Sequence, residues 1–309
     1  MLFHRKAALN SAAFLLIRQA ADTPFRNTLA ASLISACARR IGVLAVATVL
    51  GGCSALPWLS PHEKAESIAG AAGVELRKVA SPPFLLTTFQ TANPSGNNTL
   101  TVYIEGDGAS WVAPTLPPAD PTPLNPVSLI LASHDQRHPV LYIARPCQYL
   151  NETELASCYY KNWTTGRFSP EVIESVDNVV SRVKVSTGTQ QVRLVGFSGG
   201  GVVAALVAAR RQDVESLVTV AAPLDVAAWS AFHRINPLRD SMNPMDFIRE
   251  LSQIRQVHLV GEKDMIVPPA YAREIQIRMP FAKYIIVPGY THECCWVENW
   301  PEFIPKELR

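Results

Sequence analysis

Apolar and polar positions alternate along this chain with two different periods. Short runs rich in Val, Ile and Leu predict buried strands, and the longer stretches with apolar residues at helical spacing predict amphipathic helices. We expect strands at 84–90, 100–105, 140–144, 191–196, 216–221, 257–260 and 283–287, and helices at 126–133, 169–185, 201–211, 245–254 and 270–279. Strands that alternate with helices predict an α/β fold, with a mostly parallel central sheet and helices on both faces.

The segments that connect these elements predict a hairpin and several long loops. A turn-forming segment at 93–98 joins the first two expected strands, so we expect an antiparallel hairpin at one edge of the sheet. We expect loop insertions at about 106–126, 145–168 and 222–244. Long loops in such folds often act as lids or specificity elements.

One junction between a strand and a helix carries a candidate nucleophile. Gly196, Ser198 and Gly200 form the pattern G-x-S-x-G at the end of an apolar strand and before an apolar helix. A serine on so tight a turn takes a strained backbone conformation, and side chains at the flanking positions would collide. The turn also leaves the Gly199 N–H free to stabilise an oxyanion. The non-catalytic alternative is a glycine-rich turn before a buried helix.

A serine nucleophile needs a base, and the base needs an orienting carboxylate. Asp264 lies just past one later strand, and His292 lies in the corresponding loop after the next strand. Because the carboxyl ends of parallel strands share one edge, these loops lie on the side of the sheet that carries Ser198. Glu262 and Asp225 are the competing candidates for the acid.

The order Ser198, Asp264, His292 resembles that of the α/β-hydrolases from about residue 76 to the end of the chain. The resemblance implies a serine hydrolase in which Ser198 attacks, His292 acts as base and Asp264 orients the imidazole. It implies an acyl-enzyme intermediate and neither cofactor nor metal.

The resemblance also implies a second oxyanion donor after an earlier strand, at the Asp107 N–H, with Gly108 or Ala109 as alternatives. Glu105 stands where the family commonly carries histidine. Acidic side chains at this position would oppose a developing negative charge unless they are paired or turned away.

Other polar and aromatic residues have two interpretations. Arg145 or Arg167 either binds an anionic group of the substrate or forms structural ion pairs. His258 lies inside an expected strand, where packing is the simpler role. Three tryptophans near the predicted site either line an apolar pocket or pack in the core: Trp111, Trp229 and Trp296.

Composition separates the first fifty residues from the rest. The chain is 48% hydrophobic and 17% charged, which is an ordinary globular composition. Six basic side chains and one acidic side chain precede Cys53, so the net charge of +2 belongs to the leader and the remainder is slightly acidic. Nothing in this pattern predicts a nucleic-acid partner.

The amino terminus predicts export. Arg39 and Arg40 precede an apolar run at 41–50, which is too short to span a bilayer. The sequence 50–53 resembles a bacterial lipobox, which implies that Cys53 is lipidated and begins the mature protein. Ser54 implies the outer membrane, facing the periplasm. A plain signal peptide or a short anchor is the alternative, and 34–37 is a weaker second lipobox-like site.

The predicted organisation therefore has three parts: a leader at 1–52, a lipidated tether with a short helix at 53–75, and a hydrolase domain at 76–309. Besides Cys37 and the lipidated Cys53, four cysteines remain, and they permit three pairings. We favour a disulfide between Cys147 and Cys158, with Cys294 and Cys295 either bonded to each other or to the earlier loop. No C-x-x-C spacing favours a metal site.

These observations predict an exported serine hydrolase that cleaves carboxylic esters, or thioesters or amides. The substrate is a small-molecule or lipid-like acyl compound, and the membrane is contacted through the lipid anchor. The alternatives are a non-catalytic envelope-binding lipoprotein on the same fold and an acyltransferase.

Overall fold

A computed structural model of the protein describes residues 59–109, 113 and 116–307. The predicted leader, the predicted lipidation site Cys53 and the candidate pocket residue Trp111 lie outside these residues. The division between tether and hydrolase domain stays a prediction.

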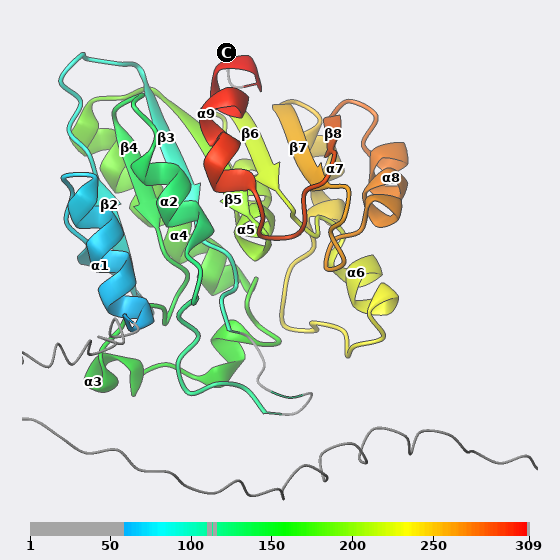
Figure 1. The fold of residues 1–309 in the computed structure, drawn as a ribbon, viewed down its shortest axis with the longest axis horizontal. Coiled ribbons are helices and arrows are strands. Elements are labelled where there is room, and N and C mark those ends of the chain that lie inside the picture. Colours follow the sequence, from blue (N-terminus) through cyan, green and yellow to red (C-terminus); the bar gives the residue numbers. More distant parts are fainter. Residues whose placement is uncertain (1–58, 110–112, 114–115, 308–309) are drawn as a thin grey trace, which may run out of the picture. The chain divides into compact units, whose positions relative to one another are not determined.

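The core of the protein is one eight-stranded sheet, in the order β1-β2-β4-β3-β5-β6-β7-β8. The strands from β4 to β8 in this order are parallel, whereas β2 runs antiparallel to both β1 and β4. The α/β fold class, with its antiparallel hairpin at one edge, is confirmed (Figure 1). The strands are β1 (Arg77–Ser81), β2 (Phe84–Gln90), β3 (Thr99–Ile104), β4 (Val140–Ile143), β5 (Gln191–Phe197), β6 (Val214–Val220), β7 (Arg255–Gly261) and β8 (Lys283–Val287).

Helices cover both faces of the sheet (Figure 1). One face carries α1 (Pro61–Ala71), α2 (Val127–Ser133) and α9 (Trp296–Glu307), and the other carries α4 (Pro170–Thr187), α5 (Gly199–Ala208) and α8 (Pro269–Arg278). Short helices lie in the connections: α3 (Glu152–Leu155), η1 (Tyr160–Trp163), α6 (Val226–Phe232), η2 (Pro244–Phe247) and α7 (Ile248–Leu251). In the described part of the chain, no helix has the length and apolar character needed to cross a bilayer.

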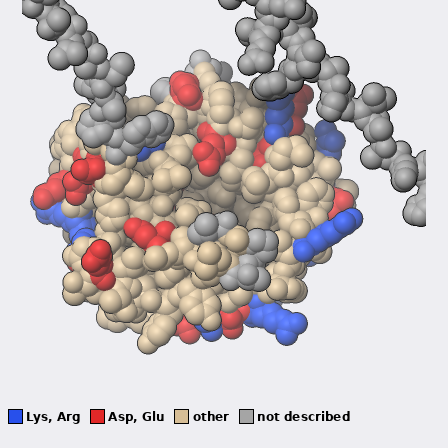
Figure 2. All heavy atoms as spheres, turned by 60° about the horizontal axis from the view of Figure 1, so that its bottom comes forward, with Lys and Arg blue, Asp and Glu red and all other residues tan. Residues whose placement is uncertain are grey.

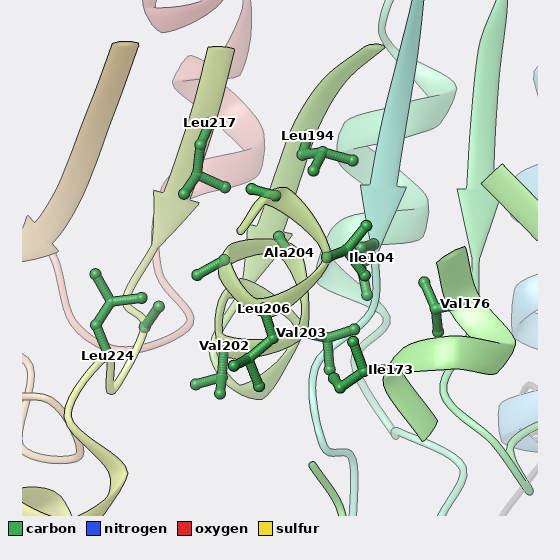
Figure 3. Close-up of a cluster of buried hydrophobic side chains, with 14 of the residues drawn as sticks. Ile104, Ile173, Val176, Leu194, Val202, Val203, Ala204, Leu206, Leu217 and Leu224 are labelled. Carbon is green, nitrogen blue, oxygen red and sulfur yellow. The ribbon is translucent and has the colours of Figure 1, made fainter. Parts of the chain in front are cut away.

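The period of two in the central strands explains the two cores. In β5, Val192 and Leu194 face the core under α4 and α5, whereas Val195 and Phe197 face the core under α2 and α9. Figure 3 shows Val203 of α5 close to Ile173 of α4, below the strands. The helix α5 is buried at every position, so its sequence is apolar all round.

Three sequence expectations need correction. The strands β2 and β3 do not form the early hairpin, because β4 lies between them; β1 pairs with β2 instead. The strand β1 is mostly exposed at the sheet edge and has no apolar run, which is why its sequence gave no strand signal. The expected helix at 245–254 is the shorter pair η2 and α7, and the loop 222–244 contains α6.

A buried histidine lies in the sheet, as the sequence predicts. His258 of β7 is 2% exposed, and its Nδ1 atom lies 2.8 Å from Thr219 Oγ1. Its Nε2 atom has no hydrogen-bond partner among the residues described. Burial lowers the pKa of His258 to about 3, because the charged imidazolium would lose its hydration.

This pKa predicts that acid destabilises the fold. Below about pH 6.5 the unfolded chain protonates His258 while the folded chain does not, so this group lowers the free energy of unfolding by about 1.4 kcal/mol per pH unit. The loss continues down to the folded pKa of about 3. We expect His258→Asn to show a shallower pH dependence in urea unfolding than the wild type. The exposed His134→Asn is the control, and equal slopes for His258→Asn and wild type would contradict the prediction.

Candidate active site

The turn between β5 and α5 holds Ser198 in a strained conformation. Its φ is 51° and its ψ is −125°, and its N–H donates to the Val220 carbonyl of β6 at 2.8 Å. A Cβ on Gly196 would overlap the backbone of Gly200, and a Cβ on Gly200 would overlap the carbonyls at the end of β3. The glycines of the predicted pattern are therefore required by contact between backbones.

The structure brings together the three residues that the sequence selects. His292 Nε2 lies 3.0 Å from Ser198 Oγ, and His292 Nδ1 lies 2.9 Å from Asp264 Oδ2. Asp264 is 1% exposed, and its other oxygen accepts the N–H groups of Ile266 and Val267, each at 2.8 Å. This arrangement fixes the carboxylate and can hold the imidazole with one nitrogen toward the serine.

The competing acids lie in other contacts. Glu262 accepts the Gly289 N–H at 2.9 Å, and Asp225 accepts the Ala228 N–H at the start of α6 and pairs with Arg278. Within the described residues, no group of three or more His, Cys, Asp or Glu side chains is arranged to hold a metal ion.

The loop after β3 lies directly beside the serine turn. Ile104 of β3 is in register with Gly196 of β5, and a Cβ on Gly199 would overlap the Asp107 carboxylate. Glu105 turns away from this contact. Its carboxylate accepts the N–H groups of Gly106, Ser128 and Leu129 and the Tyr142 hydroxyl, at 2.9 to 3.2 Å. Burial raises the pKa of Glu105, and these hydrogen bonds partly offset the rise.

Two buried arginines neutralise Asp107. Arg145 Nη1 and Arg167 Nη1 lie 2.7 and 2.8 Å from its two carboxylate oxygens, and each guanidinium side chain is 5% exposed. Burial alone would raise the pKa of Asp107, but Arg167 and Arg145 outweigh it and hold that pKa below its usual value. The cluster carries a net positive charge beside the serine turn. The two arginines thus form structural ion pairs.

A side chain after β4 orients the peptide group between Gly106 and Asp107. Gln148 is 1% exposed, and its Nε2 donates to the Gly106 carbonyl at 3.0 Å. Gln148 follows β4 and Ser198 follows β5, and β3 lies between these strands. Because the N–H of a trans peptide points opposite to its carbonyl, the Asp107 N–H faces the side of β5.

The donors available for an oxyanion follow from these contacts. In the part of the chain that is described, neither the Asp107 N–H nor the Gly199 N–H donates a hydrogen bond. The Ala109 N–H donates to the Pro121 carbonyl at 3.1 Å, so it is occupied.

The loops around the site are tied down by further contacts. Trp296 is fully buried, and its indole N–H donates to the His292 carbonyl at 2.9 Å, which makes it a packing residue. Trp229 is partly buried against the core, and its indole N–H donates to the Ile266 carbonyl at 2.7 Å. The four cysteines in the described part of the chain form two disulfides: Cys147 with Cys158, and Cys294 with Cys295.

Residues 133–287 match the protein family described as serine hydrolase (FSH1). The matched segment covers half of the chain and includes Ser198 and Asp264. The chain belongs to this serine hydrolase family. The predictions of a serine hydrolase and of an α/β-hydrolase fold are confirmed. No curated protein matches the chain.

Solved structures show the same fold at low sequence identity. Est1E from Butyrivibrio proteoclasticus, with ferulic acid bound, is 12% identical at a TM-score of 0.55, covering 75% of this chain and 99% of that one. A putative α/β hydrolase from Agrobacterium tumefaciens is 10% identical at a TM-score of 0.51, covering 75% and 96%. A serine hydrolase homologue from Coxiella burnetii is 14% identical at 0.50, covering 76% and 97%.

Sequence reasoning offered structural ion pairs for Arg145 and Arg167, but it missed their partner, Asp107, and the role of Gln148. Arg145 and Gln148 lie beside the β3 loop because Ile143 and Ile104 are in register between two parallel strands. The signal was present as charges of opposite sign, Asp107 and Arg145, at the ends of two strands. It became readable only when those strands were known to be neighbours.

The backbone contact at the serine turn predicts a strong substitution effect. Gly200→Ala should lower the free energy of unfolding by at least about 1–3 kcal/mol, because the new methyl overlaps the carbonyls of Ile104 and Glu105. Gly70→Ala in α1 is the matched control, since a Cβ there meets nothing within 4 Å. It should be neutral or stabilise by up to about 1 kcal/mol. Urea unfolding measures both, and equal effects would contradict the overlap.

Proposed function

We propose that the protein cleaves carboxylic esters through a triad of Ser198, His292 and Asp264. The observation that carries the proposal is the chain of contacts from Ser198 Oγ to His292 Nε2, at 3.0 Å, and from His292 Nδ1 to Asp264 Oδ2, at 2.9 Å. Nucleophile, base and orienting acid are thus within hydrogen-bonding distance without rearrangement.

The reaction has two halves. Ser198 Oγ attacks the acyl carbon while His292 Nε2 takes its proton, and the bond to the leaving alcohol breaks as His292 returns that proton to the alcohol oxygen. Water then attacks the acyl-enzyme, with His292 again as base, and releases the carboxylic acid and free Ser198. Asp264 stabilises the imidazolium in both halves and stays ionised.

The proposed oxyanion site consists of the Gly199 and Asp107 N–H groups. Both N–H groups lack an acceptor among the residues described, and the contact of Gln148 with the Gly106 carbonyl supports the orientation of the second. The arginines on Asp107 remove the negative charge that would otherwise oppose the intermediate.

We propose that the protein acts in the bacterial cell envelope. The lipobox-like sequence ending at Cys53 and the two disulfides of the domain are consistent with an exported lipoprotein. We infer that it acts at the outer membrane, facing the periplasm, on an acyl substrate that is small or lipid-like.

The triad predicts a defined set of losses. Against a panel of nitrophenyl esters graded by chain length, Ser198→Ala should lose about 10⁶-fold in kcat and Asp264→Asn about 10⁴-fold. Glu262→Gln, which alters the competing acid, should retain activity. A fluorophosphonate probe should add its mass to the peptide that contains Ser198.

Absence of labelling on folded, oxidised protein would reject the triad. Product analysis with added alcohol acceptors separates hydrolysis from acyl transfer, because only a transferase would yield new esters.

The oxyanion site predicts a role for Gln148 in positioning. Gln148→Met should lower kcat by up to about 10²-fold with little change in KM, because a misplaced oxyanion donor weakens only the transition state. Thr122→Val is the matched control. The buried Thr122 hydroxyl accepts the N–H of Tyr149, the residue after Gln148, at 2.8 Å, and it does not contact Gly106. It should lower thermal stability without lowering kcat. Equal kcat losses in the two variants would assign Gln148 a purely structural role.

A further inference from the structure

Large apolar side chains are exposed around the edge of the sheet that holds Ser198 and His292. The connections after β3, β4, β6 and β7 leave the sheet at this edge, and they carry most of the large apolar side chains exposed in the described part of the chain. We call six of them the apolar rim: Leu116, Leu124, Tyr159, Phe232, Met265 and Ile266. Figure 2 shows this edge coming forward, with a hollowed surface that is largely uncharged and with charged side chains mostly toward the periphery.

Hydrogen bonds tie the apolar rim to the proposed triad. They join the Ile266 N–H to Asp264 Oδ1 at 2.8 Å, His233 Nε2 to the Ile266 carbonyl at 2.7 Å, and Asn125 Nδ2 to Glu293 Oε2 at 3.2 Å. His233 follows Phe232, Asn125 follows Leu124, and Glu293 follows His292. Leu124, Phe232 and Ile266 of the rim therefore lie in connections that are hydrogen-bonded to the loops of the proposed triad.

The amino-terminal side of the domain reaches the same edge. In the first turn of α1, His62 Nε2 lies 3.2 Å from Asp120 Oδ2, and Lys64 Nζ donates to the Leu124 carbonyl at 3.0 Å. Asp120 and Leu124 belong to the connection after β3. The chain from Cys53 to Leu59 can span at most about 20 Å, so a lipid on Cys53 would hold this edge close to a bilayer.

We propose that the apolar rim docks on a phospholipid bilayer and that Ser198 takes its ester substrate from that lipid layer. An exposed apolar surface of this kind fits the boundary between headgroups and acyl chains. The short predicted tether leads into the start of α1 at this edge, and this points to a lipid surface as the occupant. The inference rests on the proposed function for its substrate, and on Cys53 lipidation for the anchor.

The test uses the full chain, processed in a bacterial host and reconstituted in phosphatidylethanolamine and phosphatidylglycerol vesicles. Two activities are measured: hydrolysis of a long-chain ester embedded in the vesicles, and hydrolysis of a water-soluble acetate ester. The double variant Leu124→Ser and Phe232→Ser should lower the ratio of the first to the second by at least about tenfold. Tyr159→Ser is a second rim variant that serves if the double variant does not fold.

The control removes two apolar side chains that lie outside the rim and are at least as exposed as Leu124 and Phe232. Val185 in α4 and Ile277 in α8 are 79% and 80% exposed. The double variant Val185→Ser and Ile277→Ser should keep the wild-type ratio. If this ratio falls as far in the control variant as in the rim variant, or if it does not fall in the rim variant, the docking proposal is overturned.

A second measurement is independent of catalysis. Trp229 lies on α6 near Phe232, so vesicles with brominated acyl chains should quench its fluorescence, and the Trp229→Phe variant should lose that part of the quenching. Quenching that persists in the rim variant overturns docking, as does a rim-dependent dimer that forms without vesicles. If the soluble ester is not hydrolysed and the fluorophosphonate probe does not label Ser198, while the quenching is intact, then the proposed function is rejected and docking is not. Mass spectrometry that finds no acyl group on Cys53 overturns the anchor.

Discussion

The first turn of α5 approaches the ends of β3 and β5 so closely that no side chain fits between the backbones. Gly196 and Gly200 make this approach possible, and Ser198 accommodates it with a φ of 51°. The same contact presents the serine hydroxyl at the sheet edge and sets the Gly199 N–H beside the β3 loop. The contacts of Ser198 with His292, and of Gly199 with the β3 loop, are made from this turn.

The β3 loop places two acidic side chains beside the proposed oxyanion site, and each of them is neutralised or hydrogen-bonded. Glu105 stands where related hydrolases commonly carry histidine, yet its carboxylate is used to hold the first turn of α2. Asp107 packs against Gly199 but is held by two buried arginines. Burying such a cluster costs solvation, which the ion pairs and hydrogen bonds recover only with good geometry. The result is a loop whose acidic side chains are each paired or hydrogen-bonded.

The candidate site and the loops around it lie at the carboxyl edge of the sheet. The triad contacts, the disulfide-closed loop after β4, the apolar rim and the start of α1 all lie there. Parallel strands explain this concentration, since every connection after a strand leaves from one side. Structures only 10% to 14% identical share the fold.

The sequence by itself determined the α/β class, most of the strands and the three residues that meet at the site. Those features depend on local patterns: apolar period, glycine spacing, and a polar residue just after a strand. The tertiary structure decided that β1, not β3, pairs with β2, and that Arg145, Arg167 and Gln148 support the β3 loop. These contacts join residues far apart in the chain across neighbouring strands. Only the strand order places them together, and no local pattern encodes that order.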